Sequence, residues 1–209
     1  MLRDIIYYAQ LAFESVIGVV GIRFYEEPRY DLLAALPAAI EIRRYAPRLA
    51  AQVELPEDGD QARDEAFRLL FRYIAGANVS AEKVAMTVPV ATEAAREKVA
   101  MTVPVETAQA EQRLRMRFFL PARYTAATAP RPEDARVRIV PVAAETVAVL
   151  RFSGRGSEPE RERRKAELLA GLAGSAWRPV GDPSLLFYDA PFTLPFLRRN
   201  EAAVGVEPR

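Results

Sequence analysis

A nine-residue stretch that occurs twice constrains the fold of this chain more than any other feature. Glu82–Val90 and Glu97–Val105 both read EKVAMTVPV, and only the six residues ATEAAR separate them. In each copy every second residue, from the first valine on, is valine or methionine, which is the period of a strand with one buried face. We therefore predict two neighbouring antiparallel strands whose apolar side chains share a face. The side chains expected on that face are Val84, Met86, Val88, Val90, Val99, Met101, Val103 and Val105.

The rest of the chain contains further strand patterns. Ile40–Glu54 reads as a strand in which Pro47 marks an edge or a bulge, because proline cannot donate to a sheet ladder. More strands are predicted at Leu114–Leu120, within Val137–Phe152 and, as two short ones, within Trp177–Val206.

Two helices are predicted between these strands. Asp60 can cap a helix that runs to about Ala75. Ser157 begins a second helix, with Glu160 at the spacing of a capping box, and this helix runs to about Ala173. The element order is β-α-β-β, an intervening stretch, then β-α-β-β again. Helices do not alternate singly with strands, so we predict an α+β fold with a curved antiparallel sheet rather than a doubly wound parallel one.

The composition excludes several classes of function. Lys and Arg number 29 against 28 Asp and Glu, so the chain lacks the basic excess of most nucleic-acid-binding proteins. It has no cysteine, which excludes disulfides, thiolate metal sites and cysteine nucleophiles. It has no histidine, which excludes imidazole-bound zinc and histidine-based catalytic arrangements. We therefore predict a non-enzymatic protein with no catalytic residues, no metal site and no nucleic-acid partner.

The first 22 residues have an amphipathic pattern that predicts a helix. Their uncharged runs, Ile5–Phe13 and Ser15–Ile22, are too short to span a bilayer, which takes about 20 residues. The segment also lacks the basic start and cleavage site of a signal peptide. The helix could dock on its own domain, on a second subunit in a homo-oligomer, or on a membrane surface. We expect a cytoplasmic protein, with peripheral membrane contact through residues 1–22 as the alternative.

Several stretches, taken in order, resemble the SOUL heme-binding protein family. The resemblance covers roughly residues 24–206, so we expect a domain over residues 24–209 and an N-terminal extension over residues 1–23. The stretches are IEIRRYAPRLAAQV, FRYIAGAN, the doubled KVAMTVPV, RMRFFLPARY, PRPEDARVRIVPVAAETVAVLRFSG and LPFLRRNE.

The resemblance implies both a fold and a ligand. The fold is a distorted antiparallel β-barrel of two pseudo-symmetric βαββ halves with two flanking helices, an architecture shared with gyrase-inhibitor-like effector-binding domains. The ligand is heme or another tetrapyrrole, held in an apolar groove beside the first domain helix in a carrier or buffer role. The alternative is an effector-binding-type module for another hydrophobic small molecule.

The first domain helix carries the candidate groove. Its apolar arc is about 200° wide, whereas packing on one layer needs only about 100°. One edge can face the sheet, while the other, with Phe67, Phe71 and Ile74, can line a groove. That second edge could instead be covered by the N-terminal helix or by a dimer partner.

The loop Pro191–Phe196 is the candidate for a further wall of the groove. Its apolar side chains Phe192, Leu194 and Phe196 could face a ligand. The alternative is a packed loop that closes the end of the barrel.

Arginines near the helix are candidates for contacts with heme propionates, because a guanidinium donates two parallel hydrogen bonds to a carboxylate. The resemblance places Arg72 at a basic position that the family uses in this way. Arg63 lies beside Asp64, where the family has another arginine, and Arg198 and Arg199 lie near a third such position. Taken alone, each of these arginines fits a solvated surface charge better.

Axial ligation by histidine, proposed for one branch of the family, is impossible in a chain without histidine. Met86, Met101 and Met116 fit a strand core better than iron ligation. We therefore expect capture of the tetrapyrrole by apolar contact, with weak ligation or none.

Overall fold

The computed structural model describes residues 25–56, 59–80, 96–110, 113–189 and 193–209. The predicted N-terminal helix, residues 1–22, and the first copy of the repeat, Glu82–Val90, lie outside the described residues. Within the described ranges, no helix is long and apolar enough to cross a bilayer.

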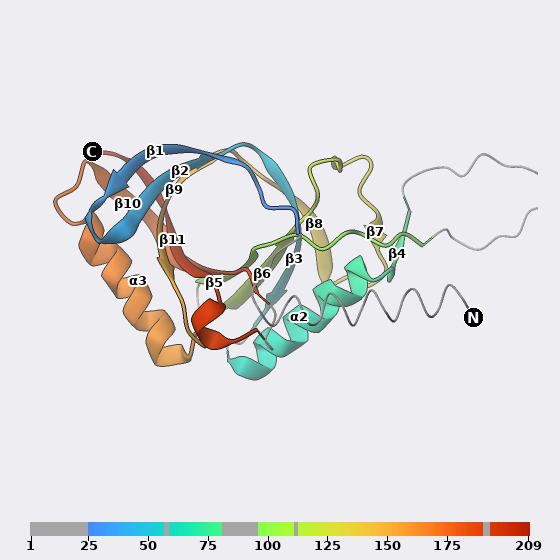
Figure 1. The fold of residues 1–209 in the computed structure, drawn as a ribbon. Helices are drawn as coiled ribbons and strands as arrows, with labels where there is room; N and C mark the ends of the chain where they lie inside the picture. The colour runs from blue at the N-terminus through green and yellow to red at the C-terminus, as the bar shows by residue number, and fades with distance from the viewer. Residues whose placement is uncertain (1–24, 57–58, 81–95, 111–112, 190–192) are drawn as a thin grey trace, which may run out of the picture.

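In the described residues, nine strands form one antiparallel sheet with the order β1-β2-β9-β11-β10-β5-β6-β3-β8 (Figure 1). Their bounds are β1 Tyr30–Leu36, β2 Ile40–Tyr45, β3 Arg48–Leu55, β5 Val105–Ala110, β6 Arg113–Phe119, β8 Val137–Val142, β9 Glu145–Phe152, β10 Trp177–Phe187 and β11 Asn200–Pro208. Two short strands, β4 Asn78–Val79 and β7 Arg131–Pro132, pair separately. The helices are α2 Asp60–Ile74 and α3 Glu158–Leu172, and the 3-10 turns are η1 Pro37–Ala39 and η2 Pro195–Leu197.

Apart from the additional edge strand β1, the sheet order is symmetric about the contact between β5 and β10. One half runs β3-α2-β5-β6 and the other β9-α3-β10-β11, and in each half the last strand lies between the other two. Strand β2 comes directly before the first half in the sequence but pairs with β9 of the second half. Strand β8 comes directly before the second half but pairs with β3 of the first half. The predicted α+β class and the two βαββ units are thus observed, and the halves exchange their outer strands.

The sheet curls strongly, and Figure 1 shows both helices against its outer face. Helix α2 contacts β3, β6 and β8, and α3 contacts β9, β10 and β11. The edge strands are β1 and β8, and no pairing joins them within the described part of the chain. The predicted distorted barrel is therefore an open curved sheet.

The predicted single strand Ile40–Glu54 is two strands. Strand β2 ends at Tyr45 and β3 begins at Arg48, and the two lie far apart in the sheet order. Pro47 cannot donate a backbone hydrogen bond, so the ladder breaks there and the chain crosses between halves.

The predicted strand over the second repeat copy is wrong for most of its length. Residues 97–104 make no regular ladder, and β5 begins only at Val105. The Val99 N–H donates to the Ile74 carbonyl at 2.9 Å, and the Val103 N–H donates to the Glu26 carbonyl at 3.1 Å. Val99 packs beneath α2, whereas Val103 packs in a different cluster, so the apolar side chains do not share one face.

The helix starts also differ in detail from the prediction. Gly59, not Asp60, precedes the first helical residue of α2, so Asp60 stands in the first turn, where its charge favours the helix dipole. Ser157 is the N-cap of α3 but makes no side-chain cap hydrogen bond. The carboxylate of Glu160 instead accepts the Gly156 N–H at 3.1 Å.

Three main apolar clusters follow from strand alternation. In β9, Ala148 and Leu150 pack in the cluster that includes α3, and Val147 and Val149 point to the opposite, inner face. The third and largest cluster lies beneath α2, which buries Ala66, Leu69, Leu70, Tyr73 and Ile74. The inner face has fewer apolar side chains, and this leaves room there for cavities and charged groups.

Candidate ligand-binding site

The outer edge of α2 carries an aromatic pair that is only partly covered. The Phe67 ring packs edge-on against Phe118 with 5.4 Å between ring centroids, and it stacks with Phe71 at 6.1 Å. Phe71 itself is 48% exposed. Ile74, predicted beside them, is buried in the core beneath the helix. The Phe71 ring is therefore exposed to a ligand, and the Phe67 ring beside it is held in place by the buried Phe118.

The two arginines of the predicted site lie on different sides of α2. Arg63 precedes Phe67 by four residues and Phe71 by eight, so it begins the same helical stripe. It forms an ion pair with Asp60 at 3.4 Å. Arg72 is exposed and lines a small cavity of about 30 Å³ with Asp134, at the loop before β8. Arg63 is thus the better placed of the two for a ligand on the aromatic pair.

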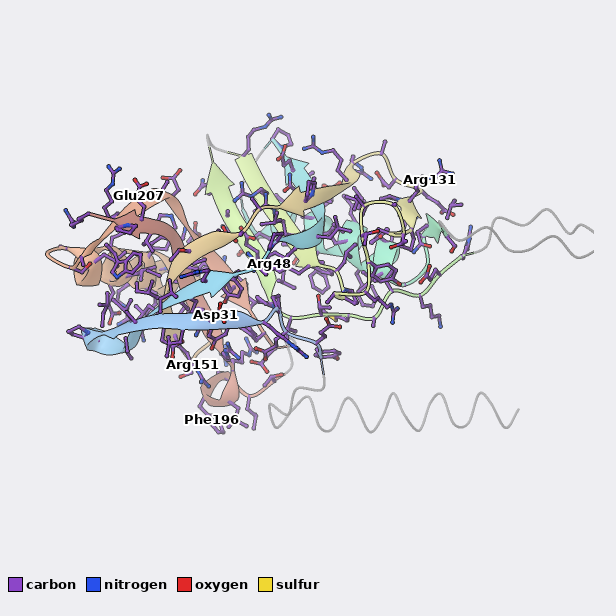
Figure 2. The ribbon with its side chains drawn as sticks, turned by 90° about the horizontal axis from the view of Figure 1, so that it is seen from above. Asp31, Arg48, Arg131, Arg151, Phe196 and Glu207 are labelled. Carbon is purple, nitrogen blue, oxygen red and sulfur yellow. The ribbon has the colours of Figure 1, made fainter. Side chains whose placement is uncertain are left out.

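The loop around η2 is the second exposed apolar region. Phe196 is 72% exposed and Leu194 is 39% exposed, and Figure 2 shows Phe196 at the outer surface. Phe192 lies outside the described residues. The Gly154 N–H donates to the Pro195 carbonyl at 2.9 Å, which fixes η2 beside the start of α3.

An ion pair relates this end of α3 to α2. Arg161 of α3 lies 3.8 Å from Asp60, the first residue of α2. Turn η2, the start of α3 and the start of α2 therefore lie near one another. Arg63, in the first turn of α2, belongs to this region together with the η2 loop, and Arg72, in the last turn, does not.

Arg198 and Arg199 have structural partners. The Arg198 Nε donates to the Thr193 carbonyl at 2.8 Å and holds the η2 loop. Arg199 pairs with Glu27 at 3.0 Å and with Glu201 at 2.9 Å. Neither arginine lies on the aromatic stripe of α2.

A buried carboxylate organises the inner face of the sheet. Glu201 is fully buried and accepts hydrogen bonds from Arg43 at 2.9 and 3.2 Å and from the Tyr188 hydroxyl at 2.6 Å. Burial acts to raise the pKa of Glu201, but the ion pairs with Arg43 and Arg199 outweigh it and leave that pKa below its ordinary value. The cluster is fully paired, so it stabilises the fold and offers no free charge to a ligand.

Two cavities lie away from α2, and sequence reasoning missed both. One, of about 370 Å³, is lined by charged and aromatic side chains of the inner face. The other, of about 720 Å³, is mainly apolar and lies at the link between β2 and β3. Both are lined by Glu27, Pro28, Arg48 and Phe119. These residues come from three distant parts of the chain, and the only local signal was the proline before Arg48.

Comparisons with known proteins agree with this architecture. A family model described as SOUL heme-binding protein matches residues 25–205. The C-terminal domain of EcmrR has 7% identity and a TM-score of 0.58, over 86% of this chain and 99% of that one. EcmrR in a DNA complex has 10% identity and a TM-score of 0.55, over 100% of this chain and 65% of that one.

A hydrolase from Listeria innocua has 14% identity and a TM-score of 0.53, over 84% of this chain and 94% of that one. At such identities these structures show a shared fold alone. Comparison with curated proteins found no match.

Proposed function

The chain belongs to the SOUL heme-binding protein family, and we propose that it binds heme or a related tetrapyrrole without catalysing a reaction. A carrier or buffer role fits a chain without histidine or cysteine, because reversible binding needs neither. The observation that carries the proposal is the open aromatic pair on α2, whose outer ring, Phe71, is 48% exposed.

We assign the ligand to the aromatic stripe of α2, with the η2 loop as a further wall. A flat macrocycle over Phe71 would gain about 25 cal/mol per Å² of apolar area that it buries, before the costs of association. Leu194 and Phe196 would add apolar area from the loop, and Phe192 is proposed with them. Arg63 would meet a propionate, and Arg72 stands too far round the helix to be the first choice.

The proposal includes binding with little or no axial ligation. Met116 is buried in the core beneath α2, and Met101 packs partly buried against the same cluster. Both side chains thus pack in the protein core instead of facing the proposed ligand, and the chain has no histidine to coordinate iron. Affinity should therefore come from the ring system and its carboxylates, which iron-bearing and metal-free porphyrins share.

A paired titration tests this. The full chain is titrated with ferric protoporphyrin and with metal-free protoporphyrin, and binding is followed by absorbance and by calorimetry. We expect dissociation constants that agree within about threefold, less than the effect of one hydrogen bond to a charged group. A preference of a hundredfold or more for the iron form would overturn the proposed absence of strong ligation. Failure of both to bind a folded sample would overturn the function.

A second candidate is a module for another hydrophobic small molecule, as in effector-binding domains. Two observations favour it, the fold shared with the EcmrR C-terminal domain and the apolar cavity of about 720 Å³. That volume lies within the range of small-molecule pockets. Binding of non-porphyrin amphiphiles, with no porphyrin binding, would select this candidate.

A further inference from the structure

Arg48 stands where the two cavities meet. It is the first residue of β3, directly after the break at Pro47, and Figure 2 shows it near the middle of the molecule. Its guanidinium lies over the Tyr45 ring at 4.3 Å and over the Phe119 ring at 4.4 Å. The side chain is 13% exposed. Two aromatic rings thus hold a cation in place at the boundary of an apolar cavity.

The hydrogen-bonding capacity of Arg48 is only partly used. Its Nη2 forms an ion pair with Glu145, while its buried Nε has no hydrogen-bond partner among the described residues. Burial lowers the pKa of Arg48 although Glu145 opposes the shift. Burial also raises the pKa of Glu145, and the charge of Arg48 opposes that shift. The attraction between the two side chains therefore offsets the cost of burying their charges only in part.

Two carboxylates and a second arginine also line the larger cavity. Glu27 pairs with Arg199 at 3.0 Å, and Glu26 accepts the Ala122 N–H at 2.9 Å. Arg29, by contrast, adds an exposed cation to the lining. Of these two carboxylates, Glu27 is thus neutralised by an arginine. An anionic ligand would meet Arg48 through the Nη2 that Glu145 holds, because the unpartnered Nε is itself buried.

The remaining lining is apolar and comes from several loops and strands. It includes Pro47, Leu49, Leu120, Pro121, Tyr124 and Val142. The cavity has a volume of about 720 Å³ and a mainly apolar lining, with the Arg48 guanidinium at its boundary. Such a cavity fits a ligand with an apolar body and one anionic head group.

We propose that this cavity binds an amphipathic organic anion, with its apolar body among these side chains and its carboxylate or sulfonate on the Arg48 guanidinium. When the ligand binds, the ion pair between Arg48 and Glu145 breaks, and the Glu145 side chain, which is 42% exposed, turns toward solvent. A planar guanidinium donates two parallel hydrogen bonds to such a head group. The site is separate from the aromatic stripe of α2 and does not depend on the proposed tetrapyrrole function.

Two fluorescent probes of similar ring structure test the proposal on the full chain. Anilinonaphthalene sulfonate carries the anionic head, and phenyl-naphthylamine lacks it. We expect one saturable site that binds the sulfonate about tenfold or more tightly than the uncharged probe, the scale of one hydrogen bond to a charged group.

Substitutions locate the site. Arg48→Gln should weaken the sulfonate about tenfold or more and leave the uncharged probe nearly unchanged, because only the head group contacts the guanidinium. Glu145→Gln should strengthen the sulfonate, because a competing carboxylate is removed. Arg138→Gln is the matched control, since Arg138 also pairs with a glutamate from another strand but is 57% exposed and lines neither cavity.

Three further results decide whether Arg48 binds the anionic head group. Equal affinity for both probes, or a sulfonate affinity that Arg48→Gln does not change, would overturn the proposal. If Arg48→Gln fails to fold, the Glu145→Gln result decides, and a weakened or unchanged sulfonate affinity would overturn it. Phe71→Glu should leave sulfonate binding intact, which separates this site from the proposed tetrapyrrole surface.

Discussion

Among the single side chains described, Glu201 is the centre of a buried cluster of ion pairs and hydrogen bonds. It is fully buried, and two arginines and a tyrosine hydroxyl donate hydrogen bonds to it. Glu201→Gln would remove the one fully buried carboxylate that Arg43 and Arg199 share, and would leave them only the partly exposed Glu41 and Glu27. We expect a loss of about 3 kcal/mol or more in the free energy of unfolding, the scale measured when one partner of a buried pair is removed.

Urea unfolding measures this loss. Glu207→Gln is the matched control, because Glu207 lies on the same strand and pairs with Arg178, yet its side chain is 47% exposed. Such surface pairs contribute about 0–1 kcal/mol. Equal effects of the two substitutions would show that the Glu201 cluster contributes no more than a surface pair.

The same residue predicts an acid-sensitive stability. The pKa of Glu201 is lowered in the folded state, so its contribution is fully present above the unfolded pKa and is lost as pH falls through the folded pKa. Between pH 7 and about pH 5 the contribution should stay constant, and it should fall below about pH 4. Urea midpoints across this range should fall more steeply for the wild type than for Glu201→Gln. Parallel curves would contradict this assignment.

Single residues could be predicted only where their neighbours are local. Phe67 and Phe71 are four residues apart on one helix, so periodicity alone placed them together. Arg43 and Glu201 are 158 residues apart, and only the pairing of β2 and β11 with β9 brings them together. Arg48 likewise depends on strand order, which no local pattern contains.

Among the helices and strands, α3 packs tightly on the sheet at Gly171. A Cβ atom added at Gly171 would lie 2.3 Å from the Ile40 Cδ1, and Ile40 is fully buried. Alanine in a helix interior normally stabilises by about 0.5–1 kcal/mol relative to glycine. Here we expect Gly171→Ala to destabilise by about 1–3 kcal/mol, because the helix or Ile40 must shift in a packed core.

A double-mutant cycle checks the cause of that loss. Ile40→Val removes Cδ1, so Gly171→Ala should cost less in the Ile40→Val background than in the wild type. Thermal or urea unfolding of the four proteins gives the coupling. The absence of coupling would mean that the Ile40 contact does not set the helix position.

Elements were predictable to the extent that their ends are set locally. Both helices fall within a residue or two of the predicted bounds, because amphipathic periodicity and end signals act within one segment. The second repeat copy was mispredicted, since its partners are the Ile74 and Glu26 carbonyls, which come from outside the repeat. Alternation indicates which side chains are buried, but not which element they face.

At the scale of the whole molecule, the exchange of outer strands joins the two halves. Because β2 completes the half of α3 and β8 completes the half of α2, neither half has all its strands without the other. We therefore expect the halves to unfold together. Leu70→Ala, a core change beneath α2, should cost about 2–5 kcal/mol.

Trp177 reports on that coupling, because it is the single tryptophan and lies in the opposite half, at the start of β10. Leu70→Ala should shift the urea transition seen by Trp177 fluorescence as far as the one seen by circular dichroism. A fluorescence transition that stays at the wild-type midpoint would show that the halves unfold separately.

The exposed aromatic pair of α2 is the proposed tetrapyrrole surface, and one substitution in it tests the proposed function. The direct measurement is the dissociation constant of metal-free protoporphyrin for Phe71→Glu, compared with Leu32→Glu. Leu32 is a matched control, because it is 57% exposed but lies on β1 and not on α2. We expect Phe71→Glu to weaken binding about tenfold or more through lost apolar contact, and Leu32→Glu to change it less than about twofold. Equal dissociation constants for the two variants would contradict binding of the tetrapyrrole at the aromatic pair of α2.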